Sequence, residues 1–182
     1  TYIDVVGSTT GKVLGTSKES VNFGIQVTGA SKGTDTTEGA YYKGYLYDSS
    51  TTATVTTSGA TVYRIFKPST NTKYTVEHYV MKTDGTYEEE ATKTDSTKTG
   101  TTDSEVTIAN LKDSTLLVTN GIYYSYGQVD GKTVTSTTIK GGGTRVIKLY
   151  YARTSGTLKT VAGENIESVT VQNSVKYYYG AT

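Results

Sequence analysis

Gly39-Ala40-Tyr41-Tyr42 recurs in this sequence as Gly121-Ile122-Tyr123-Tyr124. Each copy has an aspartate nine residues after its glycine, Asp48 in the first and Asp130 in the second. Each then runs through a Thr-rich stretch and a glycine turn to a similar closing strand, at 62–66 and 146–150. Duplication of a small unit predicts a modular chain of spacers or binding surfaces, and it argues against one catalytic cleft built from the whole chain.

The composition predicts β structure. Thr and Tyr dominate and Val is frequent, whereas Ala, Leu and Met are scarce, which is the reverse of a helix-forming chain. We therefore expect a mainly β chain with little helix, arranged as two small tandem modules. The first covers 1–68 and the second 74–153, and a short linker at 69–73, next to the only proline, keeps them in an extended arrangement. Residues 154–182 are either extra strands or the start of a further module.

Local patterns predict the individual elements. Val21, Phe23, Ile25 and Val27 alternate with small or polar residues, so we expect a strand over 21–27 with four apolar side chains on one face. Asp84-Gly85 and Asp130-Gly131 predict hairpin turns, the first followed by a return strand over 87–94. Residues 106–111 fit a strand or a short helix. Further strands are expected at 2–6, 12–15, 41–47, 51–57, 62–66, 74–80, 123–129, 134–139, 145–151, 169–171 and 175–179.

Charge and targeting signals exclude several classes. The net charge is +1 and the basic residues are spread singly, so we expect no nucleic-acid partner. No apolar run approaches 18 residues, so we expect no direct membrane insertion. The chain has no initiator Met, which we interpret as a fragment of a longer protein. The absence of Cys, with abundant Thr and Gly, favours an exported bacterial surface protein over a cytosolic enzyme.

The sequence offers little for catalysis or metal binding. The single histidine, His78, lies in an alternating strand pattern, and a strand side chain is the simpler interpretation than a catalytic base. One His and no Cys leave no ordinary zinc site. Glu88-Glu89-Glu90 could supply paired carboxylates, but a solvated charged edge explains it better. We therefore expect no enzyme activity, no catalytic residue, no metal and no cofactor.

Tyrosine clusters are the main candidates for binding. Consecutive tyrosines on a strand face both ways, so half should pack inside while the others meet solvent, where tyrosine stacks on sugar rings and anchors protein interfaces. The competing interpretation, which we favour, is that tyrosine fills the core of a chain short of aliphatic residues. A third group lies at 177–179. The candidate ligand-binding residues are Tyr41, Tyr42, Tyr45, Tyr123, Tyr124 and Tyr126.

The second copy resembles a known family. Tyr74-Thr75-Val76-Glu77-His78-Tyr79, Asp84-Gly85-Thr86-Tyr87 and the closing strand from Val146 look like the β-grasp-type repeats of Gram-positive surface proteins, namely mucin-binding-protein (MucBP) repeats and internalin B-repeats. The first copy is a more degenerate version that lacks the Asp-Gly turn. The resemblance implies β-grasp-like modules in a secreted or cell-wall-attached, multi-repeat protein, monomeric within its longer chain.

Together these features lead to one expected function and two alternatives. We expect a non-catalytic repeat region of a bacterial cell-surface protein, an adhesin module or a spacer stalk directed at host mucin, another glycoprotein or extracellular matrix. The alternative from another class is an accessory carbohydrate-binding region of a secreted glycan-degrading enzyme. A stalk without any ligand also stays open. Tyrosines exposed on one face of both modules would favour binding, and tyrosines buried in both would favour the stalk.

Overall fold

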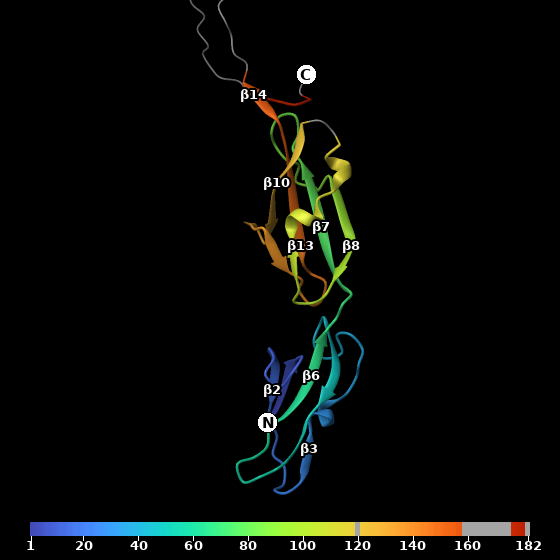
Figure 1. The fold of residues 1–182 in the computed structure, drawn as a ribbon, viewed down its shortest axis with the longest axis vertical. Helices are drawn as coiled ribbons and strands as arrows, with labels where there is room; N and C mark the ends of the chain where they lie inside the picture. The colour runs from blue at the N-terminus through green and yellow to red at the C-terminus, as the bar shows by residue number, and fades with distance from the viewer. Residues whose placement is uncertain (119–120, 158–175, 181–182) are drawn as a thin grey trace, which may run out of the picture. The chain divides into compact units, whose positions relative to one another are not determined.

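In a computed structural model of the chain, residues 1–118, 121–157 and 176–180 are described, and they form two compact units (Figure 1). Unit 1 comprises Thr1–Tyr74, Thr97–Glu105 and Thr138–Arg145. Unit 2 comprises Thr75–Ser96, Val106–Thr137 and Val146–Thr182. The described residues are 48% strand and 7% helix, with no helix of seven or more residues among them. The prediction of a mainly β chain with little helix is therefore confirmed.

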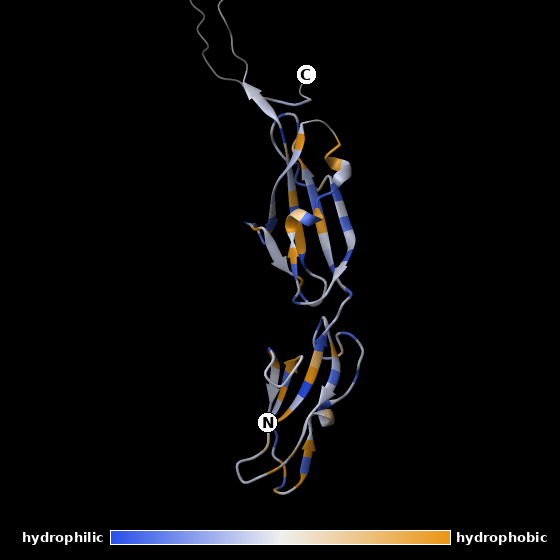
Figure 2. Cartoon of the chain, viewed as in Figure 1, coloured by the Kyte–Doolittle hydropathy of each residue, from blue (hydrophilic) through white to orange (hydrophobic). Residues whose placement is uncertain are grey.

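Unit 1 is built on a four-stranded mixed sheet in the order β2-β1-β6-β4. The two central strands, β1 (Tyr2–Val6) and β6 (Val62–Pro68), are parallel. The two outer strands, β2 (Val13–Ser17) and β4 (Tyr45–Ser50), run antiparallel to their neighbours. Hydrophobic residues are interrupted by hydrophilic ones along β6 (Figure 2), and Val62 and Phe66 are fully buried with Val5. The strands predicted at 2–6 and 62–66 are confirmed.

A second, two-stranded sheet in unit 1 corrects the strand predicted over 21–27. Only its end forms a strand, β3 (Gln26–Thr28), which pairs antiparallel with β5 (Thr52–Thr54) and leads into the 3-10 turn η1 (Gly29–Lys32). Gly24 has a left-handed backbone, with φ of 80°, which breaks the extended chain that the alternation requires. Phe23 is consequently 72% exposed, and Val21 and Ile25 are also exposed. The predicted strand over 21–27, with four apolar side chains on one face, is therefore wrong for most of its length.

The strand predicted over 41–47 is also shorter than expected. Its first half is a loop that ends at Gly44, whose φ of 83° is left-handed, and β4 begins at Tyr45. Tyr41 and Tyr42 therefore lie outside the sheet, where side chains need not alternate between two faces. The strand predicted over 51–57 is likewise reduced to β5.

The second sheet has five strands in the order β11-β10-β13-β7-β8. Its central strands are β7 (Thr72–Val80) and β13 (Val146–Arg153), which are parallel, and β10 (Ile122–Val129) runs antiparallel to β13. The edge strands are β11 (Lys132–Thr133) and β8 (Lys93–Gly100). Val76, Ile147, Leu149 and Tyr151 are fully buried and form the core side of this sheet.

Shorter elements complete the chain. β9 (Glu105–Thr107) pairs with β12 (Ser136–Thr138), and the 3-10 turns η2 (Ile108–Leu111) and η3 (Ser114–Leu116) follow β9. The segment at 106–111 is thus part strand and part short helix. β14 (Ser155–Thr157) and β15 (Lys176–Tyr178) form an antiparallel pair. The strand predicted at 169–171 lies outside the described residues.

The hairpin turn at Asp130-Gly131 is confirmed, since Val129 and Lys132 pair on either side of it, whereas Asp84-Gly85 forms a tight turn within the loop between β7 and β8. Lys82 N–H donates to the Thr86 carbonyl at 2.8 Å around Gly85, and Asp130 and Gly131 both have positive φ, of 51° and 74°. Two left-handed residues in succession are the geometry of a type I′ hairpin. The return strand predicted over 87–94 is wrong for most of its length, since β8 begins only at Lys93 and the three glutamates at 88–90 are exposed and outside any strand.

The two sheets share one connectivity. In each sheet, the first strand along the chain is parallel to the last, β1 to β6 and β7 to β13. On its other side the last strand pairs with an antiparallel strand that carries a bulge, between Tyr47 and Ser49 in β4 and between Tyr124 and Tyr126 in β10. Alignment on the bulge makes Tyr47, not Tyr42, the counterpart of Tyr124. The tyrosine pairs that match in the sequence therefore occupy different positions in the two sheets.

Candidate functional site

Three tyrosines stack across the central strands on the outer face of the five-stranded sheet. Tyr126 of β10, Tyr150 of β13 and Tyr79 of β7 are register partners. The Tyr126 and Tyr150 rings lie 4.7 Å apart and are nearly parallel, and the Tyr150 and Tyr79 rings lie 5.0 Å apart. Tyr87, from the loop after the first hairpin, packs edge-on against Tyr150 at 5.1 Å. This ladder joins three strands by aromatic cross-strand pairs.

Tyr123 extends the same face. Its neighbour Tyr124 packs on the core residue Tyr151, and adjacent strand residues point to opposite sides, so Tyr123 points outward. Its side chain is 50% exposed, whereas Tyr87, Tyr126 and Tyr150 are half-buried and Tyr79 is buried. We call the set of these outward residues the tyrosine face; it consists of Tyr79, Tyr87, Tyr123, Tyr126 and Tyr150.

A polar row runs beside the tyrosine face. Gln128, Lys148 and Glu77 occupy the next outward positions on the same three strands. The Tyr79 hydroxyl donates to Glu77 Oε2 at 2.8 Å and accepts from Lys148 Nζ at 3.2 Å, and Lys148 Nζ lies 3.5 Å from the Glu77 carboxylate. A binding partner would therefore meet aromatic edges together with a charged donor and a charged acceptor.

Burial raises the pKa of three hydroxyls on this face, those of Tyr79, Tyr87 and Tyr126. Burial, followed by the charges of neighbouring tyrosines, raises the pKa of Tyr87 to about 12. A protonated phenol both donates and accepts a hydrogen bond, as does a sugar hydroxyl, so the face has the chemistry to bind a neutral polar ligand. The inner rings are stacked on one another, which leaves mainly Tyr123 and the ring edges for contact.

The tyrosines predicted in the first copy lie in a different setting. Tyr41 and Tyr42 are half-buried and pack edge-on around the Phe66 ring, with ring centroids 5.9 Å and 5.3 Å away. The Tyr42 hydroxyl donates to Asp4 Oδ2 at 2.6 Å. Tyr45 is only 6% exposed, and its hydroxyl donates to Asp103 Oδ2 at 2.5 Å. All three belong to unit 1, and their contacts are those of core and near-core residues.

The tyrosines predicted in the second copy divide between the two sides of their strand. Tyr123 and Tyr126 contribute to the tyrosine face, and Tyr124 lies on the core side. Sequence reasoning missed Tyr79, Tyr87 and Tyr150. The signal for Tyr79 and Tyr150 is the parallel register between β7 and β13, which a single sequence does not display.

Other kinds of site find no support in the described part of the chain. Within it, no group of three or more His, Cys, Asp or Glu residues could hold a metal ion. No helix in 1–118, 121–157 or 176–180 is long and apolar enough to cross a membrane. No family model, curated protein or solved structure matches the chain.

Proposed function

We propose that this chain is a non-catalytic repeat region of a bacterial cell-surface protein and that it contacts host glycoprotein or extracellular matrix through the tyrosine face. The observation that carries the proposal is the concentration of half-exposed tyrosines, Tyr123 above all, on one face of the five-stranded sheet. Tyrosine offers rigid apolar area with a hydrogen-bonding tip, which suits both sugar rings and protein surfaces. The adjoining Lys148 and Glu77 add polar contacts that give orientation.

The modular part of the proposal rests on the shared connectivity. We propose that the chain holds two tandem β-grasp-like modules, of the kind found in MucBP repeats and internalin B-repeats, in an extended, wall-attached or secreted multi-repeat protein. The parallel pairing of first and last strands in both mixed sheets supports this, as does the bulge at the same place in β4 and β10. Repeats of this kind project binding surfaces on a chain that folds unit by unit.

Binding to mucin and to a glycan array tests the proposal. The full chain should bind a mucin or a host glycan saturably, and Tyr123→Ala should weaken that binding by about tenfold, which corresponds to roughly 1.4 kcal/mol. Tyr123 is half-exposed and outside the stacked ladder, so its removal should leave the fold intact. Phe23→Ala removes an exposed aromatic from unit 1 and serves as the matched control. Equal affinity of the Tyr123→Ala variant and the unaltered chain would refute the tyrosine face as the site.

A ligand-free spacer is the second candidate. The observation in its favour is that the Tyr126, Tyr150 and Tyr79 rings stack at 4.7 Å and 5.0 Å. Their ring faces therefore contact one another and hold three strands together, which makes them less accessible to a ligand. Absence of binding to every mucin, glycan and matrix protein, with the chain folded, would favour this function. Binding confined to one plant or microbial polysaccharide would instead favour an accessory carbohydrate-binding region of a glycan-degrading enzyme.

A further inference from the structure

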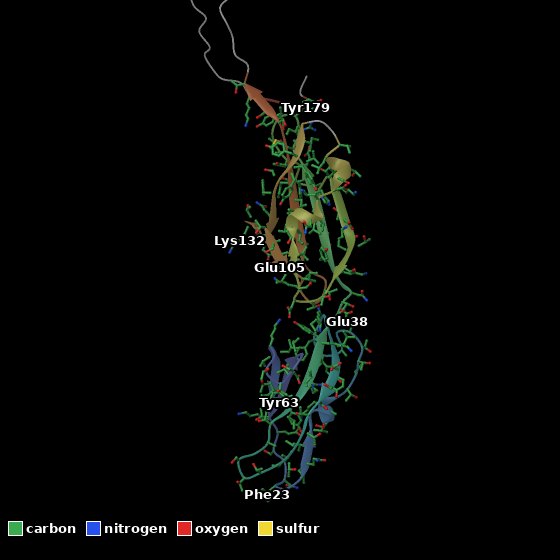
Figure 3. The ribbon with its side chains drawn as sticks, in the orientation of Figure 1. Phe23, Glu38, Tyr63, Glu105, Lys132 and Tyr179 are labelled. Carbon is green, nitrogen blue, oxygen red and sulfur yellow. The ribbon has the colours of Figure 1, made fainter. Side chains whose placement is uncertain are left out.

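One end of unit 1 exposes apolar side chains that a small β unit normally buries. Phe23 is 72% exposed at the turn before β3, flanked by the exposed Val21 and Ile25, and it lies at the end of the unit beyond β3 (Figure 3). A cavity of about 800 Å³ adjoins this turn, lined by Phe23 and Val21 together with Tyr2, Val27 and Val55. Contiguous exposed apolar surface of this kind marks an interaction site.

The Phe23-Gly24 turn has a counterpart elsewhere in unit 1. Gly24 N–H donates to the Val55 carbonyl at 3.0 Å, and Val55 N–H donates back to Ile25 at 2.9 Å. In the same pattern, Asp103 N–H donates to Ile139 at 2.9 Å, and Ile139 N–H donates to Ser104 at 3.0 Å. Gly24 and Asp103 are both left-handed, with φ of 80° and 63°. Thr102 is therefore the counterpart of Phe23.

Unlike Phe23, Thr102 is buried, and a chain of hydrogen bonds ties it to a glycine turn. Thr102 N–H donates to the Ser69 carbonyl at 2.9 Å, and Ser69 N–H donates to the Gly44 carbonyl at 2.8 Å. The approach is so close that a Cβ on Gly44 would lie 2.5 Å from Thr102 Oγ1 and from the Gly141 Cα. Thr102 itself is only 2% exposed.

The same hydrogen-bonded link occurs a second time, in unit 2. Tyr179 N–H donates to the Thr154 carbonyl at 2.8 Å, and Thr154 N–H donates to the Gly121 carbonyl at 2.6 Å. Gly121 and Gly44 have nearly equal φ, 82° and 83°. A Cβ on Gly121 would lie 2.5 Å from Tyr179 Cγ. The second link thus holds an aromatic residue followed by a left-handed glycine, Tyr179-Gly180, and Tyr179 remains 50% exposed there, whereas the smaller Thr102 is buried.

Phe23-Gly24 is the third turn of this kind, and its receiving side is open. Within the part of the chain that the structure describes, the Phe23 N–H donates to no Ser or Thr carbonyl that is itself linked to a glycine, as Ser69 is to Gly44 and Thr154 is to Gly121. In the Thr102 link, Asp103 accepts hydrogen bonds from Lys12 and from the Tyr45 hydroxyl. Gly24 has no carboxylate to do so. Phe23-Gly24 thus resembles Tyr179-Gly180, whose partner glycine is followed by the aliphatic Ile122.

We propose that the surface formed by Val21, Phe23, Ile25 and the adjoining cavity docks a further unit of the same β repeat. The docking unit presents a left-handed glycine followed by an aliphatic residue, as in Gly121-Ile122. Its Ser or Thr carbonyl, in the place of Thr154, accepts the Phe23 N–H, and the aliphatic side chain meets the apolar surface. This inference concerns repeat-to-repeat association and does not depend on glycan binding.

A tandem fusion tests the proposal with the chain itself as the partner. Val76 in β7 is the counterpart of Tyr2 in β1, since both are buried and pair with the last strand of their sheet. Ser69 lies seven residues before Val76, so Thr154 of the upstream copy should lie seven residues before Tyr2 of the downstream copy. Residues 1–159 placed directly before Thr1 of the full chain meet this spacing. The chain has no Cys, so Phe23→Cys in the downstream copy gives a single thiol whose reaction with a maleimide reports exposure. Cysteine is close in size to the threonine of the Thr102 link.

The expected result is that the thiol of the Phe23→Cys variant reacts at least about tenfold more slowly in the fusion than in the single chain, because docking buries it. Val13→Cys, at a position 58% exposed and outside the cavity lining, should react equally in both. Gly121→Asn in the upstream copy should restore fast reaction at position 23, since Asn tolerates the left-handed backbone while its Cβ blocks the approach. An unchanged reaction rate of the Phe23→Cys thiol, or slow reaction that persists with Gly121→Asn, overturns the proposal.

Discussion

The Tyr151 hydroxyl lies 2.8 Å from Nδ1 of His78 and accepts the backbone N–H of Asp113 at 2.9 Å. The hydroxyl accepts from the Asp113 N–H and still has a proton and a second lone pair, so it can also form the hydrogen bond to His78 Nδ1. Both side chains are buried. The only histidine of the chain is thus a hydrogen-bonded core residue that, with Tyr151, ties β7, β13 and the start of η3 together.

Tyr151→Phe should destabilise unit 2 by about 1–3 kcal/mol, because it leaves the buried His78 Nδ1 and the Asp113 N–H without the hydroxyl. Urea unfolding followed by circular dichroism measures the change. Tyr124→Phe is the matched control, since Tyr124 is half-buried against the same ring and makes no hydroxyl hydrogen bond within the described residues. A loss as small for Tyr151→Phe as for Tyr124→Phe would show that the hydroxyl does not hold these groups.

Asp4 and Arg64 form the corresponding polar centre of unit 1. Arg64 Nε and one terminal nitrogen donate to the two Asp4 oxygens at 2.8 Å and 2.6 Å, and both side chains are buried. Asp4→Ala leaves a buried guanidinium without its carboxylate and should cost roughly 3–5 kcal/mol. Thermal or urea unfolding gives the value.

Asp48→Ala is the control for the Asp4 measurement. Asp48 pairs with Lys67 at 3.4 Å in an exposed setting, where an ion pair contributes little, so the variant should lose less than about 1 kcal/mol. If Asp4→Ala proved as mild as Asp48→Ala, the Asp4–Arg64 pair would have to be open to solvent.

Tyr42 should make the stability of unit 1 decline in alkaline solution. Burial, and next the hydrogen bond to Asp4, raise the pKa of Tyr42 to about 12. The unfolded phenol ionises near pH 10, so between about pH 10 and pH 12 unfolding releases a proton and rising pH favours the unfolded state. The contribution is therefore complete below about pH 10 and is lost as the pH approaches 12.

Tyr42→Phe has no phenol to ionise, so its stability should fall less steeply over the same pH range. The free energy of unfolding of the unaltered chain, relative to that of Tyr42→Phe, should be roughly 1–2 kcal/mol lower at about pH 11.5 than at about pH 9. The other tyrosines are present in both proteins and cancel in the comparison. Parallel pH profiles of the two proteins would mean that Tyr42 is not shielded as its contacts indicate.

The sequence predicts the strands whose apolar side chains alternate without interruption, such as those at 2–6 and 74–80. It fails where a left-handed glycine interrupts an alternating run, since hydropathy does not reveal that Gly24 turns the chain. The tyrosine face shows the same limit. Its outward residues come together through the register of β7, β10 and β13, and register depends on pairings distant in sequence. The local match at Tyr42 and Tyr124 misaligned the two copies for this reason.

Gly127 shows how closely η2 packs on the core side of β10. A Cβ on Gly127 would lie 2.3 Å from Cγ2 of Ile108, which is fully buried. Gly127→Ala should therefore destabilise unit 2 by about 1–3 kcal/mol through overpacking. Gly156→Ala is the control, because no atom of the described residues lies within 4 Å of its added methyl.

A double-mutant cycle separates this clash from a general cost of altering β10. Ile108→Ala removes the Cγ2 atom that the new methyl meets, so Gly127→Ala should cost at least about 1 kcal/mol less in the Ile108→Ala background than in the unaltered chain. Urea unfolding of the four proteins gives the coupling energy. Additive losses would mean that η2 yields to the methyl group, and that the contact between Ile108 and Gly127 does not fix the position of the turn on the sheet.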